Sequence, residues 1–415
     1  MKVLLVLLSI AIFSAPVLAN KPNVWVISDI CDPSDRRKGG HPKMDPDDIV
    51  SMASLLLSAN KFHIENIVVA SRPGTVKDPI PFMRETFVEA YEHDIKGMNK
   101  RFPGFQDTIP FTWSSITQGE RGVQFNPDGD YRDISAYSSI VSLRDYAKNN
   151  EVYVLSWGPL TESAILVKHL LTHEDYRTLN NLNFISHWTK SYLSSYVKDG
   201  GKQYPFRVSN CRGDYKACTF LHDAAQAHDS VKLMELGATG QRGLVDGTKG
   251  YKNILLFENS RLGQIFLRGK AFNFTPDQSD AATHWVLSGE HGIGLEDYAW
   301  DGSLNEQQET KIRDAFLSNA EAMMDDLLAR AHAANSDVFA KSMVAQHYTY
   351  VYNKNDKYGI YTPYDTAYKI YDVNDNLVQS GNVEFGANRI KLPIKEEGYY
   401  KVELFYPGNT LTFSL

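Results

Sequence analysis

Residues 23–71 alternate between two strand-like apolar runs and one helix-like amphipathic run. Residues 23–28 (NVWVIS) are short, apolar and rich in β-branched side chains, which is typical of a buried strand in a parallel sheet. Residues 48–59 place apolar side chains at helical spacing, and residues 64–71 (IENIVVAS) return to a strand pattern. Because two parallel strands need a long crossover between them, this order predicts a β-α-β unit.

The same alternation continues toward the middle of the chain. We predict further helices at residues 139–148, 161–171 and 304–334, and further strands at residues 151–157 and 182–186. The expected fold class is therefore α/β, with a mostly parallel sheet flanked by helices. Ligands of such sheets bind beyond the carboxyl ends of the strands, and Asp29, Trp157 and His187 lie at three of these ends.

The pattern changes after about residue 340. Short alternating segments such as TAYKIYDV and GYYKVELFY are separated by turns rich in Asn, Asp and Gly. We predict a main domain at residues 20–338 and a small C-terminal β-sandwich at residues 339–415. Two roles remain open for the tail aromatics Tyr399, Tyr400 and Tyr406, exposed glycan binding or cross-strand core packing, and core packing is favoured.

The first nineteen residues have the pattern of a secretory signal peptide. Lys2 precedes an apolar run, Val17-Leu18-Ala19 suits the small-residue cleavage rule, and Pro16 interrupts the run too early for a membrane anchor. We therefore expect an exported protein, periplasmic or extracellular, with no membrane span. The net charge of −7 and the absence of a long basic run in the sequence argue against a nucleic-acid partner.

The sequence contains three cysteines, Cys31, Cys211 and Cys218. In an oxidising compartment Cys211 and Cys218 could close a small loop, or all three could be reduced, unrelated thiols. Cys31 lies among acidic residues that disfavour a thiolate, so we do not expect thiol catalysis.

Four aspartates surround the end of the first strand and the start of the helix that follows it. Asp45 is expected to be the helix N-cap, with Pro46 at the first helical position. Asp47 and Asp48 then lie in the first turn, where acids complement the helix dipole. Capping explains these acids but does not explain Asp29, at the end of the strand.

Carboxylates that converge on one crevice repel one another unless a cation neutralises them. An all-oxygen ligand set favours calcium (Ca²⁺) or magnesium over zinc. Calcium takes six to eight oxygen ligands, which leaves positions for a backbone carbonyl, water and the hydroxyl groups of a substrate.

The strand-end Asp29, the pair Asp47-Asp48 and the motif WGPLTESA at residues 157–164 resemble the inosine-uridine preferring nucleoside hydrolases. Residues 45–71 are more specifically similar to the nucleoside hydrolase-like branch, which includes exported proteins described as cellulose-binding and carrying a C-terminal β domain. The resemblance covers about residues 23–300 in the order of elements.

The resemblance implies a role for each matching residue. Asp29 is expected to be a metal ligand and the general base, Asp48 a metal ligand, and Asp47 a contact to the metal or to a ribose hydroxyl. Trp157 would offer its backbone carbonyl to the metal, and Asp280, which could also be a simple helix cap, would complete the shell. The implied activity is calcium-dependent hydrolysis of the N-glycosidic bonds of nucleosides or related ribosides. The alternative is a non-catalytic carbohydrate-binding protein that retains the fold.

Further candidates depend on position alone. The leaving base needs an acid or an aromatic wall, for which the candidates are His187, His284 and Trp188. Asn210 and Glu290, with His291 beside it, are weaker candidates for substrate contacts. For each of these side chains a purely structural role is the alternative.

The pattern departs from that of ordinary nucleoside hydrolases at two places. Residues 31–44, a basic and glycine-bearing insertion, separate Asp29 from the aspartate pair and could form a lid or close the pocket to nucleosides. Glu162 replaces the usual Asn after GPLT, which we expect to be a surface change. The expected partner is a small nucleoside or glycoside, with a polysaccharide as a second expectation. A haloacid dehalogenase-type phosphohydrolase is disfavoured, because it requires an aspartate at position 31.

Overall fold

The computed structural model describes residues 21–37, 40, 42–43, 45–118, 123–272, 275–335, 349–354, 357–391, 400–406 and 409–414. The predicted signal peptide at residues 1–19 lies outside these residues. Within the described part of the chain, every helix is too short or too polar to cross a bilayer.

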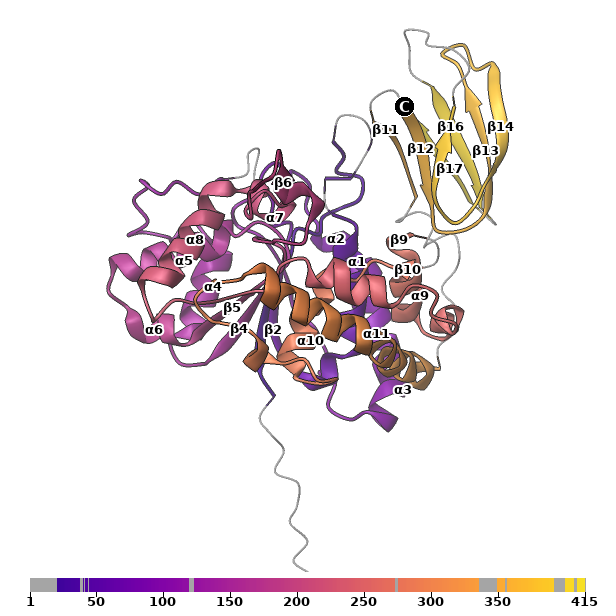
Figure 1. Ribbon diagram of the computed structural model, residues 1–415. Coiled ribbons are helices and arrows are strands. Elements are labelled where there is room, and N and C mark those ends of the chain that lie inside the picture. Colours follow the sequence, from indigo (N-terminus) through magenta and orange to yellow (C-terminus); the bar gives the residue numbers. More distant parts are fainter. Residues whose placement is uncertain are drawn as a thin grey trace, which may run out of the picture.

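A six-stranded parallel sheet forms the centre of the main domain (Figure 1). Its strands run in the order β3-β2-β1-β4-β5-β8, and every neighbouring pair is parallel. The strands are β1 Asn23–Ile27, β2 His63–Val69, β3 Phe111–Trp113, β4 Val152–Ser156, β5 Leu182–Ser186 and β8 Lys232–Glu235. The predicted strands are thus confirmed, whereas β3 and β8 are too short to give a clear sequence pattern.

Helices cover both faces of the sheet (Figure 1). They are α1 Asp47–Leu57, α2 Ile80–Met83, α3 Glu89–Arg101, α4 Ser138–Ala147, α5 Thr161–Thr172, α6 Tyr176–Asn180, α7 Ser209–Gly213, α8 Tyr215–Ala227, α9 Arg261–Arg268, α10 Ala282–Ser288 and α11 Glu306–Ala334. Apolar side chains of α1, α3, α9 and α11 pack on one face, and those of α4, α5 and α8 pack on the other. The predicted α/β fold class is confirmed.

Short helical turns complete this domain. They are η1 Ala59–Lys61, η2 Arg84–Val88, η3 Ser195–Val197, η4 Gly240–Val245, η5 Ile254–Asn259, η6 Ser279–Ala281 and η7 Leu295–Asp297. Two small antiparallel ribbons also occur, β6 Lys198–Asp199 with β7 Lys202–Gln203, and β9 Ala271–Phe272 with β10 Thr275–Pro276.

The strand order reverses between β1 and β4, and this reversal opens a crevice at the carboxyl edge of the sheet. The register pairs Ile27 with Ser156 and Ser156 with Ser186, so the ends of β1, β4 and β5 are level. The residues that follow these ends, including Asp29, therefore converge on one edge.

The C-terminal strands form two antiparallel sheets that pack as a β-sandwich (Figure 1). One sheet contains β11 Tyr350–Lys354, β12 Lys357–Thr362 and β15 Gly386–Ile390, and the other contains β14 Leu377–Val383, β13 Thr366–Tyr371, β16 Lys401–Tyr406 and β17 Asn409–Ser414. Tyr400 and Tyr406 are 8% and 5% exposed, so the favoured expectation of core packing is confirmed for both. Tyr399 lies outside the described residues.

The β-sandwich contacts the main domain at the β9–β10 ribbon. The backbone N–H of Ala271 donates to the hydroxyl of Tyr361 at 2.8 Å, and the guanidinium of Arg268 donates to the carbonyl of Pro363 at 3.1 Å. The ring of Tyr361 stacks on that of Tyr350, with centroids 5.1 Å apart. The sandwich thereby supports the ribbon from which Lys270 and Asp277 reach the crevice.

Candidate functional site

Three buried carboxyl groups meet in the crevice. Asp47 and Asp48 begin α1, Asp280 lies in η6, and one carboxylate oxygen from each lies within 4.8 Å of the others. The Ser28 hydroxyl at the end of β1 donates to Oδ1 of Asp48 at 2.6 Å, and the Ser279 hydroxyl donates to Oδ2 of Asp47 at 3.0 Å. The sheet edge and η6 therefore fix the orientation of the helix-start acids.

Several oxygens of this crevice are not satisfied. Oδ1 of Asp29, Oδ1 of Asp47 and Oδ2 of Asp48 are buried and accept no hydrogen bond from any described residue. A buried carboxylate oxygen without a donor is costly for the fold. Hard oxygen donors at this spacing fit a hard divalent cation, which would remove that cost.

The electrostatic state of the three acids reflects the same crowding. Burial, followed by the charges of Asp29 and Asp280, raises the pKa of Asp48 well above its usual value. Burial and neighbouring aspartates likewise raise the pKa values of Asp47 and Asp280. A cation that binds these acids would therefore compete with their protonation.

Asp29 lies beside this group. Its carboxyl group is within hydrogen-bonding reach of Asp48, and Nη1 of Arg72 donates to its Oδ2 at 3.0 Å. Burial raises the pKa of Asp29 although the charge of Arg72 opposes the change. A Cβ atom at Gly158 would lie 2.9 Å from the Cβ of Asp29, so the glycine of the GPLT motif makes room for this side chain.

A partly buried lysine occupies the other side of the crevice. Nζ of Lys270 lies 3.0 Å from carboxylate oxygens of both Asp45 and Asp277 and 3.4 Å from Oδ1 of Asp47. The prediction of Asp45 as the helix cap is wrong: Pro46 holds the cap position, and no side chain caps α1. A charged partner from a distant ribbon binds Asp45 more strongly than a backbone N–H would.

The ends of β4 and β5 are tied together beside the carboxylates. Nδ2 of Asn210 donates to the carbonyls of Trp157 at 3.0 Å and His187 at 2.9 Å. Nε2 of His187 lies 3.8 Å from Oδ1 of Asp280. Burial lowers the pKa of His187 to about 4, so its imidazole is neutral at neutral pH and is a poor proton donor.

His284 does not join the carboxylates. Its Nε2 lies 3.4 Å from Oγ of Ser54, two turns along α1 and about 10 Å from Asp47, and its ring packs against Phe62. Burial and the charge of Lys61 lower its pKa to about 3. His284 was a candidate acid because it follows Asp280 in the sequence. In the structure, α10 directs this side chain toward the middle of α1, in the core.

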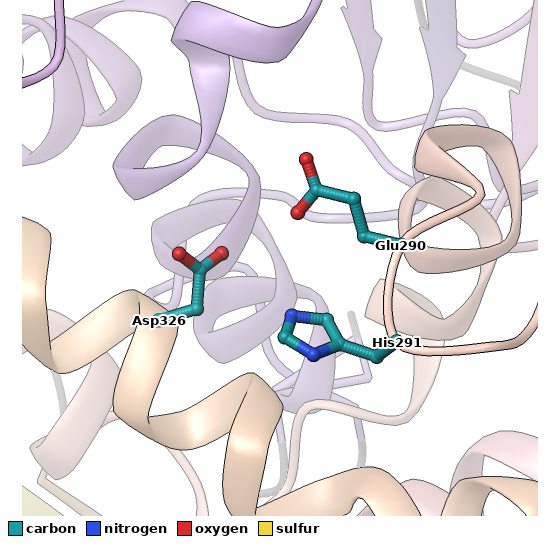
Figure 2. Close-up of side chains that lie close together, drawn as sticks. All are labelled: Glu290, His291 and Asp326. Atoms are coloured by element: carbon teal, nitrogen blue, oxygen red, sulfur yellow. The ribbon is translucent and has the colours of Figure 1, made fainter.

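Glu290 lies at the opposite end of α1 from the crevice. It forms an ion pair with Lys61, whose Nζ also lies 2.7 Å from Asp326. Figure 2 shows Glu290, His291 and Asp326 directed toward one another. Because α1 spans eleven residues, about 16 Å separates this group from Asp47, and Glu290 is not a substrate contact of the crevice.

Two further expectations concern the cysteines and Glu162. Cys211 and Cys218 form a disulfide, whereas Cys31 is buried and outside it. Trp188 packs on the small apolar cluster that contains this disulfide. The expectation that Glu162 is a surface change is wrong: its buried carboxylate accepts hydrogen bonds from Ser114 at 2.9 Å and from Ser139 at 2.6 Å.

A polar pocket of about 120 Å³ opens at the crevice. It is lined by Asp29, Arg37, Asp45, Arg72, Pro159, Ser209, Asn210 and Gly213. Arg37 belongs to the insertion at residues 31–44, so this segment contributes to the pocket wall. Sequence reasoning missed Arg37, Arg72, Lys270 and Asp277, because they reach the crevice from separate loops and follow no motif.

The fold and the site together define a class of protein. It is an α/β domain with a group of carboxylates at the point where the strand order of its parallel sheet reverses. Residues 41–232 match the family model described as "Cellulose-binding Sde182, nucleoside hydrolase-like domain". This match confirms the resemblance to the nucleoside hydrolase-like branch, and it includes Asp47 and Asp48 but neither Asp29 nor Asp280. No protein with a curated description matches the sequence.

One solved structure similar to this chain is described as a nucleoside hydrolase-related hypothetical protein from Saccharophagus degradans that is associated with carbohydrate metabolism. The two chains are 11% identical, and the TM-score is 0.48 over 95% of this chain and 98% of that one.

Proposed function

We propose that this protein is an exported, calcium-dependent hydrolase of the N-glycosidic bond of a nucleoside or a related riboside. The observation that carries the proposal is the convergence of Asp47, Asp48 and Asp280 within 4.8 Å at the carboxyl edge of the sheet. When bound there, calcium would hold vicinal sugar hydroxyls and lower the pKa of a water molecule. Asp29 and the carbonyl of Trp157 remain expected ligands.

Asp29 is the proposed general base. Its raised pKa makes it a better proton acceptor than an ordinary aspartate, as base catalysis near neutral pH requires. Arg72 holds Oδ2, so Oδ1, which has no partner among the described residues, is the oxygen available to receive a proton from water. His187 is neutral and beside Asp280, where it supports the ligand rather than donating to the leaving group.

A second candidate function is carbohydrate binding without catalysis. The ion pair of Arg72 with Asp29 favours it, because the guanidinium already neutralises the proposed base. The pocket of about 120 Å³ is also below the range of about 300–1,000 Å³ that is usual for small-molecule sites. The family description names cellulose binding, which agrees with a sugar as ligand.

Export is part of the proposal. The signal-like residues 1–19 support it, and so does the Cys211–Cys218 disulfide, because disulfides form and persist mainly in oxidising compartments. The family description fits a protein that meets polysaccharide outside the cytoplasm.

The test is hydrolysis of a panel of nucleosides and aryl ribosides by the purified protein, with calcium or with a chelator. We expect activity that requires calcium and is lost in Asp29→Ala, while Asp130→Ala, an exposed aspartate on another loop, behaves as wild type. Activity that persists in Asp29→Ala contradicts the assignment of the base. Sugar binding without turnover in the wild type supports the second candidate instead.

A further inference from the structure

Exposed aromatic side chains are unevenly distributed over the surface. Among the described residues, four tyrosines are strongly exposed, and three of them lie close together in the sequence. Tyr196, Tyr204 and Tyr215 are 60%, 42% and 56% exposed, whereas the fourth, Tyr176, belongs to α6. All three follow β5 and precede or begin α8, on the segment that forms one wall of the crevice.

This segment is built on a rigid base. Trp188 has a φ angle of 55°, a left-handed conformation that bulky residues rarely adopt and that surrounding contacts must hold in place. Its ring packs on the disulfide cluster, and the ring of Tyr196 lies 6.1 Å from it, centroid to centroid. The guanidinium of Arg207 lies 4.8 Å from the ring centroid of Tyr204. The aromatic rings are therefore presented from a fixed surface.

Part of the same segment lines the pocket. Ser209, Asn210 and Gly213 line the pocket together with Asp29, and Arg212 lies in the same one-turn helix, α7. Asn210 donates to the carbonyl of His187, the residue before Trp188.

The charge of the segment differs in sign from that of the protein. Residues 198–216 contain five basic and two acidic residues, in a chain with a net charge of −7. Asp199 is paired with Arg207 at 3.0 Å, and Asp214 is buried as the cap of α8. Exposed Lys202 and Arg212 therefore add positive charge to the segment that carries the tyrosines.

We propose that the exposed side chains of residues 188–216 bind the sugar rings of an acidic glycan. A sugar ring has an apolar C–H face that stacks on tyrosine or tryptophan and polar edges that hydrogen bond to tyrosine hydroxyls. Carboxylate or sulfate groups on the glycan meet Lys202 and Arg212. The proposal concerns this surface and goes beyond the proposed function of the crevice.

The test is isothermal titration of the full mature chain with three oligosaccharides of similar length. An oligogalacturonate supplies carboxylates, a sulfated galactan oligosaccharide supplies sulfates, and cellohexaose is neutral. We expect at least one acidic oligosaccharide to bind about tenfold or more tightly than cellohexaose, with affinity that falls as salt rises. Equal or tighter binding of cellohexaose overturns the acidic assignment, and binding of none of the three overturns the proposal.

Surface variants locate the binding. The double variant Tyr196→Ala/Tyr204→Ala should bind about tenfold more weakly, whereas Tyr176→Ala should bind as wild type. Lys202→Gln/Arg212→Gln should weaken only the acidic oligosaccharides, with Lys252→Gln as its control. These side chains are exposed, so circular dichroism should show unchanged folding. Wild-type affinity in the double tyrosine variant overturns the proposal.

The two proposals fail separately. A protein that cleaves ribosides with calcium but binds none of the oligosaccharides retains the proposed function and loses this inference. A protein that binds an acidic oligosaccharide through these tyrosines, but hydrolyses no riboside, supports this inference and contradicts the proposed function.

Discussion

The crevice and the C-terminal β-sandwich both bury polar groups, but they satisfy them differently. In the sandwich the hydroxyl of Tyr406 lies 2.8 Å from that of Thr349 and 2.6 Å from that of Thr362. In the crevice, buried oxygens of Asp29, Asp47 and Asp48 accept no hydrogen bond from a described residue. Satisfied buried polar groups stabilise a fold, whereas buried carboxyl oxygens without a hydrogen-bond donor mark a candidate ligand site.

The two regions also differ in the aromatic side chains that they expose. The sandwich buries Tyr400 and Tyr406, and its strongly exposed large apolar side chains, among the described residues, are Val373 and Leu377. The strongly exposed tyrosines among the described residues belong instead to the α/β domain. The sandwich supports the β9–β10 ribbon, and the proposed glycan surface lies on the α/β domain.

The largest expected effect is the loss of calcium binding in Asp48→Asn. Asp48 contributes a carboxylate to the group and is oriented by Ser28, so the amide should weaken calcium about 100-fold or more. Without calcium, and at pH above the raised pKa of Asp48, the same variant should be more stable than wild type, because asparagine places no charge in the buried crevice. Calorimetric titration and thermal unfolding measure both effects, with exposed Asp78→Asn as control. Unchanged affinity would remove Asp48 from the site.

The second effect is a dependence of stability on pH that calcium abolishes. Asp47, Asp48 and Asp280 have pKa values raised above 3.8 in the folded protein, so each binds its proton more tightly there than in the unfolded chain. Without calcium, their contribution to stability should therefore decrease as pH rises from about 4 through the raised pKa values. It should then level off.

Each pKa unit amounts to about 1.4 kcal/mol. Unfolding by guanidinium between pH 4 and 8, with a chelator and with saturating calcium, tests this expectation. A calcium-free protein whose stability rises steadily over this range is the contradictory result.

A smaller effect is expected from the disulfide. Replacing both Cys211 and Cys218 by serine should lower the free energy of unfolding by about 2.5 kcal/mol, because the bond restricts the unfolded chain. Calcium affinity should change little, since the bond supports the aromatic surface and contributes no carboxylate. Chemical unfolding and calcium titration measure the two quantities, and reduction of the wild type with a thiol is the matched control. A large loss of calcium affinity would show that the two parts are not separable.

The smallest expected effect comes from the sandwich contact. Tyr361→Phe leaves the N–H of Ala271 without its acceptor and should lower stability by about 1 kcal/mol. Calcium affinity should stay within about twofold of wild type, because the rings of Tyr361 and Tyr350 still stack. Tyr176→Phe is the control. A larger loss of affinity would assign the sandwich a direct part in the site.

The sequence predicted those parts of the fold that depend on local pattern. The strand at residues 182–186 was expected with the bounds that the structure gives to β5, because a buried strand is a short, continuous apolar run. Strand β14 (LVQSGNV) was not predicted, because it lies at the edge of its sheet and carries mostly exposed polar residues. Only its pairing with β13 makes it a strand.

The candidate site was predicted in part for the same reason. Asp29, Asp47 and Asp48 follow from the geometry of a strand end and a helix start, which are close in sequence. Arg72 and Lys270 were not predicted, because ion pairs between distant loops leave no periodic signal. His284 and Glu290 were candidates because they follow Asp280 in the sequence. Both lie outside the crevice, because nearness in sequence does not fix which way a side chain points.

The proposed function depends on one hard cation bound by the crevice carboxylates. Calorimetric titration of the chelator-treated wild-type protein with calcium, in the presence and absence of magnesium, tests it most directly. The proposed function predicts one calcium ion per chain, whose binding becomes stronger as pH rises, because the carboxyl groups have raised pKa values. No binding, or binding that Asp48→Asn leaves intact, would contradict a metal site in this crevice.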